Sequence, residues 1–217
     1  LQTPGATNSV LADVGANVVR FDKPHGFYTN SFLLTLTAAV PDSVIRYTLD
    51  GTLPTVSKGI IYTNPIPLKP NTSAAARGTR IVRAVAFSSK AAYAPVNTQT
   101  YLFINGETSP TADGVIGQSQ MTTSITKSAV YGPLMDDALY ALPTMSLVIP
   151  LGLDTAEHAA SIELFDPAQQ ENGFQVDCGV SATGTTSLGS PKLSMAAKFR
   201  SEYGHSKLRY PMFARGS

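Results

Sequence analysis

Short runs in which apolar and polar residues alternate recur along the first hundred residues. Alternation with a period of two places successive side chains on opposite faces of a strand, and β-branched and aromatic residues favour that conformation. Clusters of Pro, Gly, Asn and Asp separate the runs and interrupt regular pairing. The pattern therefore predicts strands at 18–21, 32–37, 44–49, 65–68, 79–87 and 98–104.

The spacing of these runs also indicates an architecture. Six or seven short strands with turns between them, and with no helical period, are typical of an immunoglobulin-like or fibronectin-like β-sandwich of roughly 90 residues. We therefore predict such a sandwich over residues 17–104, preceded by a tail or linker at 1–16.

One turn within this region, in the stretch VIRYTLDGTLPT (44–55), raises a choice between a structural corner and the rim of an active site. Asp-Gly is favoured where a hairpin needs positive φ, because Gly has no Cβ and Asp tolerates the left-handed region. Proline cannot donate to a strand ladder, so Leu53-Pro54 is expected to end regular pairing. We interpret Asp50-Gly51 as a structural corner.

The second half of the chain changes character before strand patterns return. Small polar residues without a period occupy 105–131, which we predict to be a linker or long loop. Pro133 and Pro143 bound an apolar-faced segment, predicting a short helix within 132–143. Strands follow at 144–149, 161–165, 173–180 and 193–199, so the fold class is mainly β: a sandwich, then a second β-rich domain at 132–217 with one short helix.

Composition limits the kinds of partner that the chain is expected to bind. Apolar residues make up 43% of the chain and charged residues 14%, and the formal net charge is +1. The Lys and Arg residues form no run dense enough to follow a phosphate backbone or an anionic lipid surface. No apolar segment reaches the roughly 20 residues needed to span a bilayer. We therefore predict no nucleic-acid partner and no membrane span.

Cysteine usage excludes an internal disulfide, and composition favours an exported protein. Cys178 is the single cysteine, so it cannot close an internal disulfide, and we predict a small buried apolar side chain there. Richness in Thr, Ser, Ala, Gly and Pro suits a secreted or cell-surface bacterial β protein. The start LQTPGATN lacks a basic region and an apolar core, so an export signal is expected to have been removed or to lie outside this sequence.

No catalytic, cofactor-binding or metal site is predicted. His25, His158 and His205 lie far apart in the sequence and have no cysteine partners at zinc-site spacing. No Gly-x-Ser-x-Gly elbow is present, and the loops SPTADG and TGTTSLG lack the Gly-Lys-Ser/Thr end of a phosphate-binding loop.

Carboxylates offer another candidate chemistry. Two converging carboxylates could support glycosidase chemistry, and the candidates are Asp136, Asp137, Glu157, Glu163 and Asp166. We expect all of them to be solvated. Glu163 alternates with Ile162 and Leu164, which places it on the opposite face of the strand, where an exposed carboxylate is expected.

Basic residues and aromatic residues each allow two interpretations, one as a ligand-binding site and one as part of the fold. Lys192, Lys198 and Arg200 could meet an anionic ligand, but we favour charges at a strand edge that discourage aggregation. Carbohydrate binding is an alternative because exposed aromatic rings can stack on sugars. The chain has no Trp, however, and half-buried packing in or near strands accounts for Tyr47, Tyr62 and Tyr101.

Several motifs together resemble known families. The stretches IRYTLDGTLPT, IYTNPIPL, TRIVRAVAF and TQTYLF resemble the chitobiase/β-hexosaminidase C-terminal-type domain over about residues 17–104. That resemblance implies an accessory module without catalytic residues. The opening LQTPGATN resembles the end of a bacterial lamin-tail domain.

The order of PTMSLVIP, ASIELFDP, GFQVDCGV and SPKLSMAAKFRSEYG is similar to the opening part of the CotH-like family, which has an atypical kinase fold. The sequence departs from that family at LGLDTAEHA, where relatives carry a longer insertion, and at ATGTTSLGS, where they often show Gly-Gly-x-Ser-Arg. The family's nucleotide- and metal-holding residues come later than Ser217. The resemblance therefore implies a partial domain that does not transfer phosphate alone.

These observations favour a non-catalytic extracellular structural or interaction module. Its low charge and many strand edges favour protein partners or pairing between copies, and a cell-wall or matrix glycan is a further candidate partner. The alternatives are the N-terminal fragment of a secreted CotH-like kinase and a carbohydrate-binding accessory module. A native polypeptide that continues beyond Ser217 with metal-binding acids would favour the kinase alternative.

Overall fold

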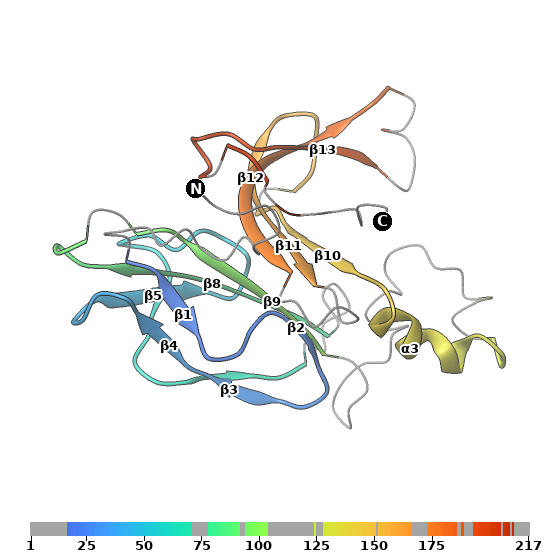
Figure 1. The fold of residues 1–217 in the computed structure, drawn as a ribbon, viewed down its shortest axis with the longest axis horizontal. Helices are drawn as coiled ribbons and strands as arrows, with labels where there is room; N and C mark the ends of the chain where they lie inside the picture. The colour runs from blue at the N-terminus through green and yellow to red at the C-terminus, as the bar shows by residue number, and fades with distance from the viewer. Residues whose placement is uncertain are drawn as a thin grey trace, which may run out of the picture.

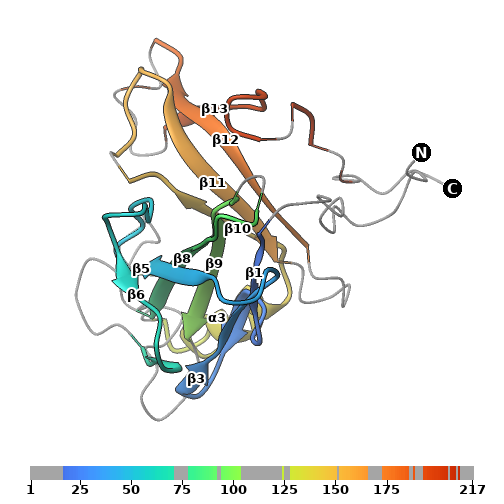
Figure 2. The same cartoon turned by 90° about the vertical axis from the view of Figure 1, so that its left-hand side faces the viewer.

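Two groups of strands make up the described structure. The computed structural model describes residues 17–70, 78–91, 94–103, 124, 128–150, 152–165, 173–185, 188, 193–204, 206–208 and 210. The first group lies below the second in Figure 1, and the long strands of the second group rise from the sheet of the first in Figure 2. The mainly β fold class is therefore confirmed, as is a sandwich followed by a second β-rich part.

We name the first group the N-terminal sandwich. Its strands are β1 Val19–Phe21, β2 Gly26–Tyr28, β3 Phe32–Leu34, β4 Leu36–Ala38, β5 Val44–Thr48, β6 Ile60–Ile61, β7 Ile66–Leu68, β8 Thr79–Phe87 and β9 Asn97–Phe103. One layer is a five-stranded sheet in the order β2-β9-β8-β5-β6, and the opposite layer consists of the two-stranded sheets β1-β4 and β3-β7. Pairing is antiparallel except between β2 and β9.

The core of the sandwich follows the predicted alternation. Val82, Ala84 and Ala86 share one face of β8 and are buried, and the rings of Tyr101 and Phe103 lie beside them on β9. Residues from β1, β3, β4 and β7 close this core from the other layer. Apolar side chains are thus removed from water between two layers of the same unit.

The predicted strand at 32–37 is wrong in one respect, because it is two strands in two sheets. The chain bends at Thr35: β3 pairs with β7, whereas β4 pairs with β1. The Thr35 amide donates to Asp22 Oδ1 at 2.7 Å, and the Asp22 amide donates to the Thr35 carbonyl at 3.1 Å. The side chain of Asp22 therefore stabilises the transition between the sheets.

Asp50-Gly51 is a structural corner, as predicted, but it is not a two-residue hairpin. Gly51 has φ of 78°, and the Asp50 carboxylate accepts from the Thr52 amide at 3.0 Å and the Thr52 hydroxyl at 2.6 Å. The strand that pairs with β5 begins only at Ile60. The reversal therefore takes the whole loop 49–59, in which the Asp50 carboxylate and the left-handed backbone of Gly51 together turn the chain.

We name the second group the C-terminal sheet. Its strands are β10 Thr144–Val148, β11 His158–Phe165, β12 Phe174–Thr183 and β13 Ser194–Lys198, paired antiparallel in that order and curled like part of a barrel. A 3-10 turn η1 (Gly132–Leu134) and a short helix α3 (Met135–Tyr140) precede it, which confirms the short helix predicted within 132–143.

One face of the C-terminal sheet carries its own apolar cluster. Ile162, Leu164, Val176 and Val180 are buried there with Cys178. Cys178 is fully buried, as predicted, and burial raises the pKa of its thiol to about 11, so the thiol stays protonated at neutral pH.

Parts of the prediction lie outside the described residues. The predicted tail at 1–16 does so entirely, and the predicted linker at 105–131 does so except for residues 124 and 128–131. The predicted domain boundaries stay predictions. In the described part of the chain, no helix combines the length and apolarity needed to cross a bilayer.

Candidate functional site: a buried polar joint

The faces that bring the two units together are rich in buried polar residues, which lie beside apolar ones such as Val85 and Leu102. On β8 and β9, the residues that alternate with the sandwich core include Arg83, Thr98 and Thr100, all of them buried. On β11 and β12, the residues that alternate with the second apolar cluster include Ser161, Glu163, Gln175 and Asp177. We call these residues, together with His25 and Ser146, the joint. β9 contacts both β11 and β12 there.

Glu163 lies at the centre of the joint and is completely buried. Its Oε1 is 2.9 Å from His25 Nδ1 and accepts the Thr100 amide at 3.0 Å. Its Oε2 accepts the Thr100 hydroxyl, whose oxygen is in turn 2.9 Å from the Ser146 hydroxyl. The carboxylate of one unit is therefore satisfied by donors of the other unit, which is what a buried charge requires.

The Thr100 amide is available to Glu163 because of the sheet register. The Phe103 amide donates to Gly78 on the β8 side of β9, so Thr100, an odd number of residues away, points its amide to the β2 side. β2 begins at Gly26, opposite Tyr101, and does not extend as far as the Thr100 amide. Glu163 thus supplies the acceptor at the position where strand pairing stops.

Arg83 and Asp177 form a second part of the joint. Arg83 Nη1 donates to the Gly51 carbonyl at 3.2 Å, and Nη2 is 3.8 Å from Asp177 Oδ1. Gln175 Nε2 donates to Ser161 Oγ at 2.9 Å and to Asp177 Oδ1 at 3.3 Å. Burial raises the pKa of Asp177 to about 6, although Arg83 acts in the opposite direction.

Apolar contacts flank this polar centre. The His25 ring meets Phe165 edge-on, with ring centroids 4.7 Å apart, and Phe27 contacts both Phe165 at 6.3 Å and Tyr140 of α3 at 5.1 Å. On the other side, a Cβ added to Gly51 would lie 3.3 Å from Val148 Cγ1. The Asp50-Gly51 corner therefore abuts the C-terminal sheet.

The structure corrects the prediction that Glu163 is exposed. The alternation was right, since Glu163 lies on the face opposite Ile162 and Leu164, but the N-terminal sandwich covers that face. Of the other joint residues, only His25 was singled out from the sequence, as a histidine without metal-site spacing. Polar residues at alternate positions of otherwise apolar strands, such as Arg83 in TRIVRAVAF, were the available signal.

Glu157, which we expected to be solvated, is instead paired near the surface. Lys198 Nζ is 2.8 Å from its carboxylate and Arg200 Nε is 3.0 Å from it, and hydrogen bonding from Lys198 lowers its pKa. β13 is the last strand in the order of the C-terminal sheet, so Lys198 stands at a strand edge, as we favoured. Burial and the hydrogen bond to Glu157 raise the pKa of Tyr203 to about 12.

Among the residues that the structure describes, the other candidates do not converge on one site. His158 Nε2 is 2.8 Å from Asp154 Oδ1, whereas His25 pairs with Glu163 in the joint. Among the residues described, no group of three or more His, Cys, Asp or Glu side chains could hold a metal ion. Asp137 is exposed. Lys192, His205, Asp166 and the side chain of Asp136 lie outside the described part of the structure.

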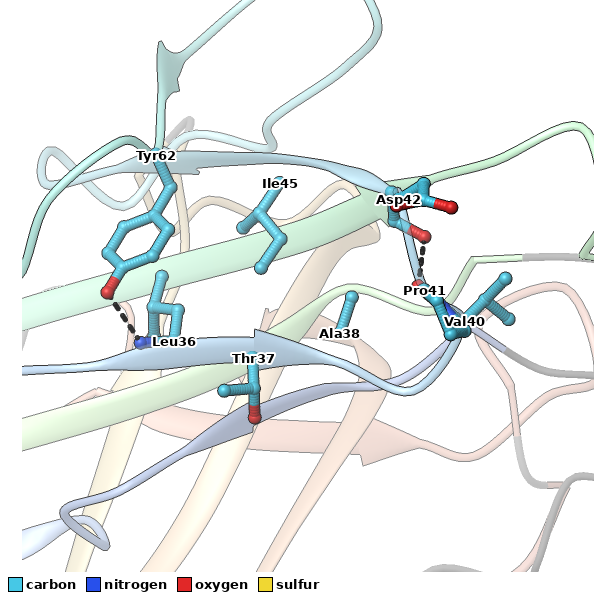
Figure 3. A pocket seen from close by; sticks show the side chains of 9 residues that line it. Leu36, Thr37, Ala38, Val40, Pro41, Asp42, Ile45 and Tyr62 are labelled. Atoms are coloured by element: carbon cyan, nitrogen blue, oxygen red, sulfur yellow. Dashed lines mark hydrogen bonds between the residues drawn. The ribbon is translucent and has the colours of Figure 1, made fainter.

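The tyrosines considered for sugar stacking are packing residues. Tyr101 is fully buried, and Tyr47 and Tyr62 pack against the sandwich core. Tyr62 also lines an open groove of about 250 Å³ beside the turn between β4 and β5, where its hydroxyl accepts the Leu36 amide at 3.1 Å (Figure 3). Leu36, Ala38 and Ile45 make most of that groove apolar.

The fold and the joint together define a mainly β protein built from two packed units. A family model described as Fn3 associated matches residues 34–101, which run from the end of β3 into β9. No curated protein and no solved structure matches the chain. This match confirms none of the lamin-tail, chitobiase C-terminal-type and CotH-like resemblances, which stay predictions.

Proposed function

We propose that this chain is a non-catalytic structural and interaction module of a secreted or cell-surface bacterial protein, in which the joint holds two β units in a fixed orientation. The observation that carries the proposal is Glu163, a fully buried carboxylate of the C-terminal sheet whose donors come from the N-terminal sandwich. Such a pairing is lost if the two units move apart, because the carboxylate then loses all of these donors.

The match to an Fn3-associated family supports an accessory role for residues 34–101. The distribution of polar groups supports it further. The buried ionisable side chains of the joint are engaged with one another across the two units, and Glu157 is engaged with Lys198 and Arg200. An arrangement of this kind serves to position protein parts and leaves these carboxylates little capacity for a substrate.

Protein partners, including a second copy of the chain, are part of the proposal. β6 ends the five-stranded sheet, and both of its side chains are exposed, Ile60 at 53% and Ile61 at 49%. β10 and β13 end the C-terminal sheet and carry the exposed side chains of Met145 and Met195. Apolar side chains on terminal strands favour association with another protein surface.

The orientation of the two units can be measured by electron spin resonance. Spin labels are attached at Ser57→Cys in the sandwich and Thr155→Cys before β11, both exposed positions, in a chain carrying Cys178→Ala. We expect one narrow distance distribution, because the joint fixes the units. Glu163→Ala should broaden this distribution while circular dichroism still reports β structure.

Glu157→Ala is the matched control, since it removes a paired carboxylate of the same sheet that lies outside the joint. It should leave the distribution narrow. A broad distribution in the unaltered chain, or an unchanged one in Glu163→Ala, would refute the fixed orientation. If Glu163→Ala fails to fold, Glu163→Gln, which removes the charge but keeps one oxygen acceptor, takes its place. Light scattering of the same samples tests association, which a strict monomer at high concentration would exclude.

A further inference from the structure

Two polar atoms of the joint are buried without a hydrogen-bond partner. They are Arg83 Nε and Thr98 Oγ1. Arg83 is 2% exposed and Thr98 is fully buried, so bulk water does not reach either side chain. Buried polar atoms in folded proteins nearly always have a partner, and an ordered internal water is a common one.

The two atoms belong to neighbouring residues. Arg83 and Thr98 are directly opposite each other in the antiparallel pair of β8 and β9, so their side chains leave the sheet on the same face. That face is turned to the C-terminal sheet, where Asp177 lies closest to the guanidinium group. The distance of 3.8 Å between Arg83 Nη2 and Asp177 Oδ1 is too long for a direct hydrogen bond.

We propose that the joint binds one internal water molecule between Arg83 and Thr98. The water accepts a hydrogen bond from Arg83 Nε and donates one to Thr98 Oγ1, and its second hydrogen is directed to the Asp177 carboxylate. Arg83 Nε is only a donor, whereas a carboxylate is only an acceptor, so the bridging molecule must both accept and donate. Three polar partners are the usual number for a buried water.

The local charges select water over an ion. An anion at this position would lie near Glu163 and Asp177, both of which face the joint, and a cation would lie against the Arg83 guanidinium. A neutral molecule avoids both repulsions. The water enters from the side of Asp177, because the side chain of Asp177 is 29% exposed, whereas that of Glu163 is fully buried.

The joint therefore has two halves that satisfy their buried polar groups differently. On the Glu163 side, protein donors satisfy the carboxylate directly. On the Arg83 side, the guanidinium group uses Nη1 for the Gly51 carbonyl and relies on solvent for Nε. Losing the water is more costly than immobilising it, because a buried donor and a buried acceptor would both remain unpaired.

A crystal structure of the whole chain that resolves ordered waters tests the proposal. We expect one water within hydrogen-bonding distance of both Arg83 Nε and Thr98 Oγ1. In solution, amide protons of β8 and β9 should show magnetisation exchange with a long-lived water. Thr98→Val keeps the shape of the side chain but removes its oxygen, so it should abolish both signals, whereas Thr98→Ser should retain them.

Several results would overturn the proposed water. Electron density without a water at this position, or with Arg83 Nε donating directly to a protein acceptor, would overturn the proposal. Persistence of the water in Thr98→Val would overturn the role of Thr98. Should Thr98→Val not fold, the unaltered chain and Thr98→Ser alone supply the test.

Discussion

The two units bury apolar surface in different ways. The N-terminal sandwich closes its core between two layers of its own strands, with rings such as Tyr101 and Phe103 fully enclosed. The C-terminal sheet has one layer of strands, an apolar cluster on one face and the polar joint on the other. The difference indicates that the sandwich is self-contained, whereas the C-terminal sheet depends on its neighbour to satisfy a buried carboxylate.

A cavity in the sandwich core should lower the stability of the chain more than any other change proposed below. Leu34 is fully buried, so Leu34→Ala should lower the free energy of unfolding by about 2–5 kcal/mol, through lost burial and a new cavity. Because the C-terminal sheet relies on the sandwich at the joint, hydrogen-exchange protection of β12 should fall together with that of β8. Urea denaturation and hydrogen exchange measure the two effects.

Leu33 provides the control, since it precedes Leu34 in β3 but points outward and is 60% exposed. Leu33→Ala should change the unfolding free energy by no more than about 0.5 kcal/mol. If β12 keeps its hydrogen-exchange protection when Leu34→Ala weakens β8, the C-terminal sheet does not depend on the sandwich, and the contrast drawn between the two units is wrong.

The joint should make stability depend on pH through Asp177. Its pKa is raised from 3.8 to about 6, so between these values the folded state binds more protons than the unfolded state. The free energy of unfolding should therefore fall as pH rises from about 4 to about 6, and stay level above that range. The shift from 3.8 to about 6 sets an upper limit of about 3 kcal/mol on this contribution.

Urea denaturation from acid to neutral pH gives the unfolding free energy of the unaltered chain and of Asp177→Asn. The part of the difference between these two free energies that varies with pH is the contribution of Asp177. Asp154→Asn should show the opposite sign, because hydrogen bonding from His158 lowers the pKa of Asp154 and its stabilisation is lost as pH falls. A difference between Asp177→Asn and the unaltered chain that does not vary with pH would show that Asp177 is not buried as described.

The corner at Asp50 should give the smallest effect, since it lies outside both cores. Asp50→Ala removes the acceptor for the Thr52 amide and hydroxyl and should lower the unfolding free energy by about 1 kcal/mol. Asp50→Asn keeps an oxygen acceptor and should lose less, as measured by thermal or urea unfolding. Equal losses in the two variants would mean that the side-chain oxygen does not stabilise the turn.

Strands with a sustained local pattern could be predicted from the sequence. β8 extends over 79–87 as expected, and β10, β11, β12 and β13 each overlap a predicted run. β2 and β6 were not predicted, because their sequences GFY and II do not alternate between apolar and polar residues. The break at Thr35 was missed because the residues on both sides of it are equally apolar, and the bend depends on the distant side chain of Asp22.

The joint could not be predicted from the sequence. Periodicity correctly assigned Glu163 to the face opposite Ile162, but it carries no information about what covers that face. The covering residues Arg83 and Thr100 lie more than sixty positions earlier in the chain. Burial of a polar face is a tertiary property, so a carboxylate that reads as solvated in its own strand was found to be the most enclosed charge of the interface.

The polar character of the joint also bears on biosynthesis. The sandwich is translated first, and the side of its main sheet that awaits the later strands displays the guanidinium of Arg83 and the hydroxyls of Thr98 and Thr100. A nascent chain that has folded only this far exposes these polar groups, which water solvates well, beside the apolar side chains of Val85 and Leu102. The polar groups therefore reduce the apolar surface that this side presents to other chains before the remaining residues are made.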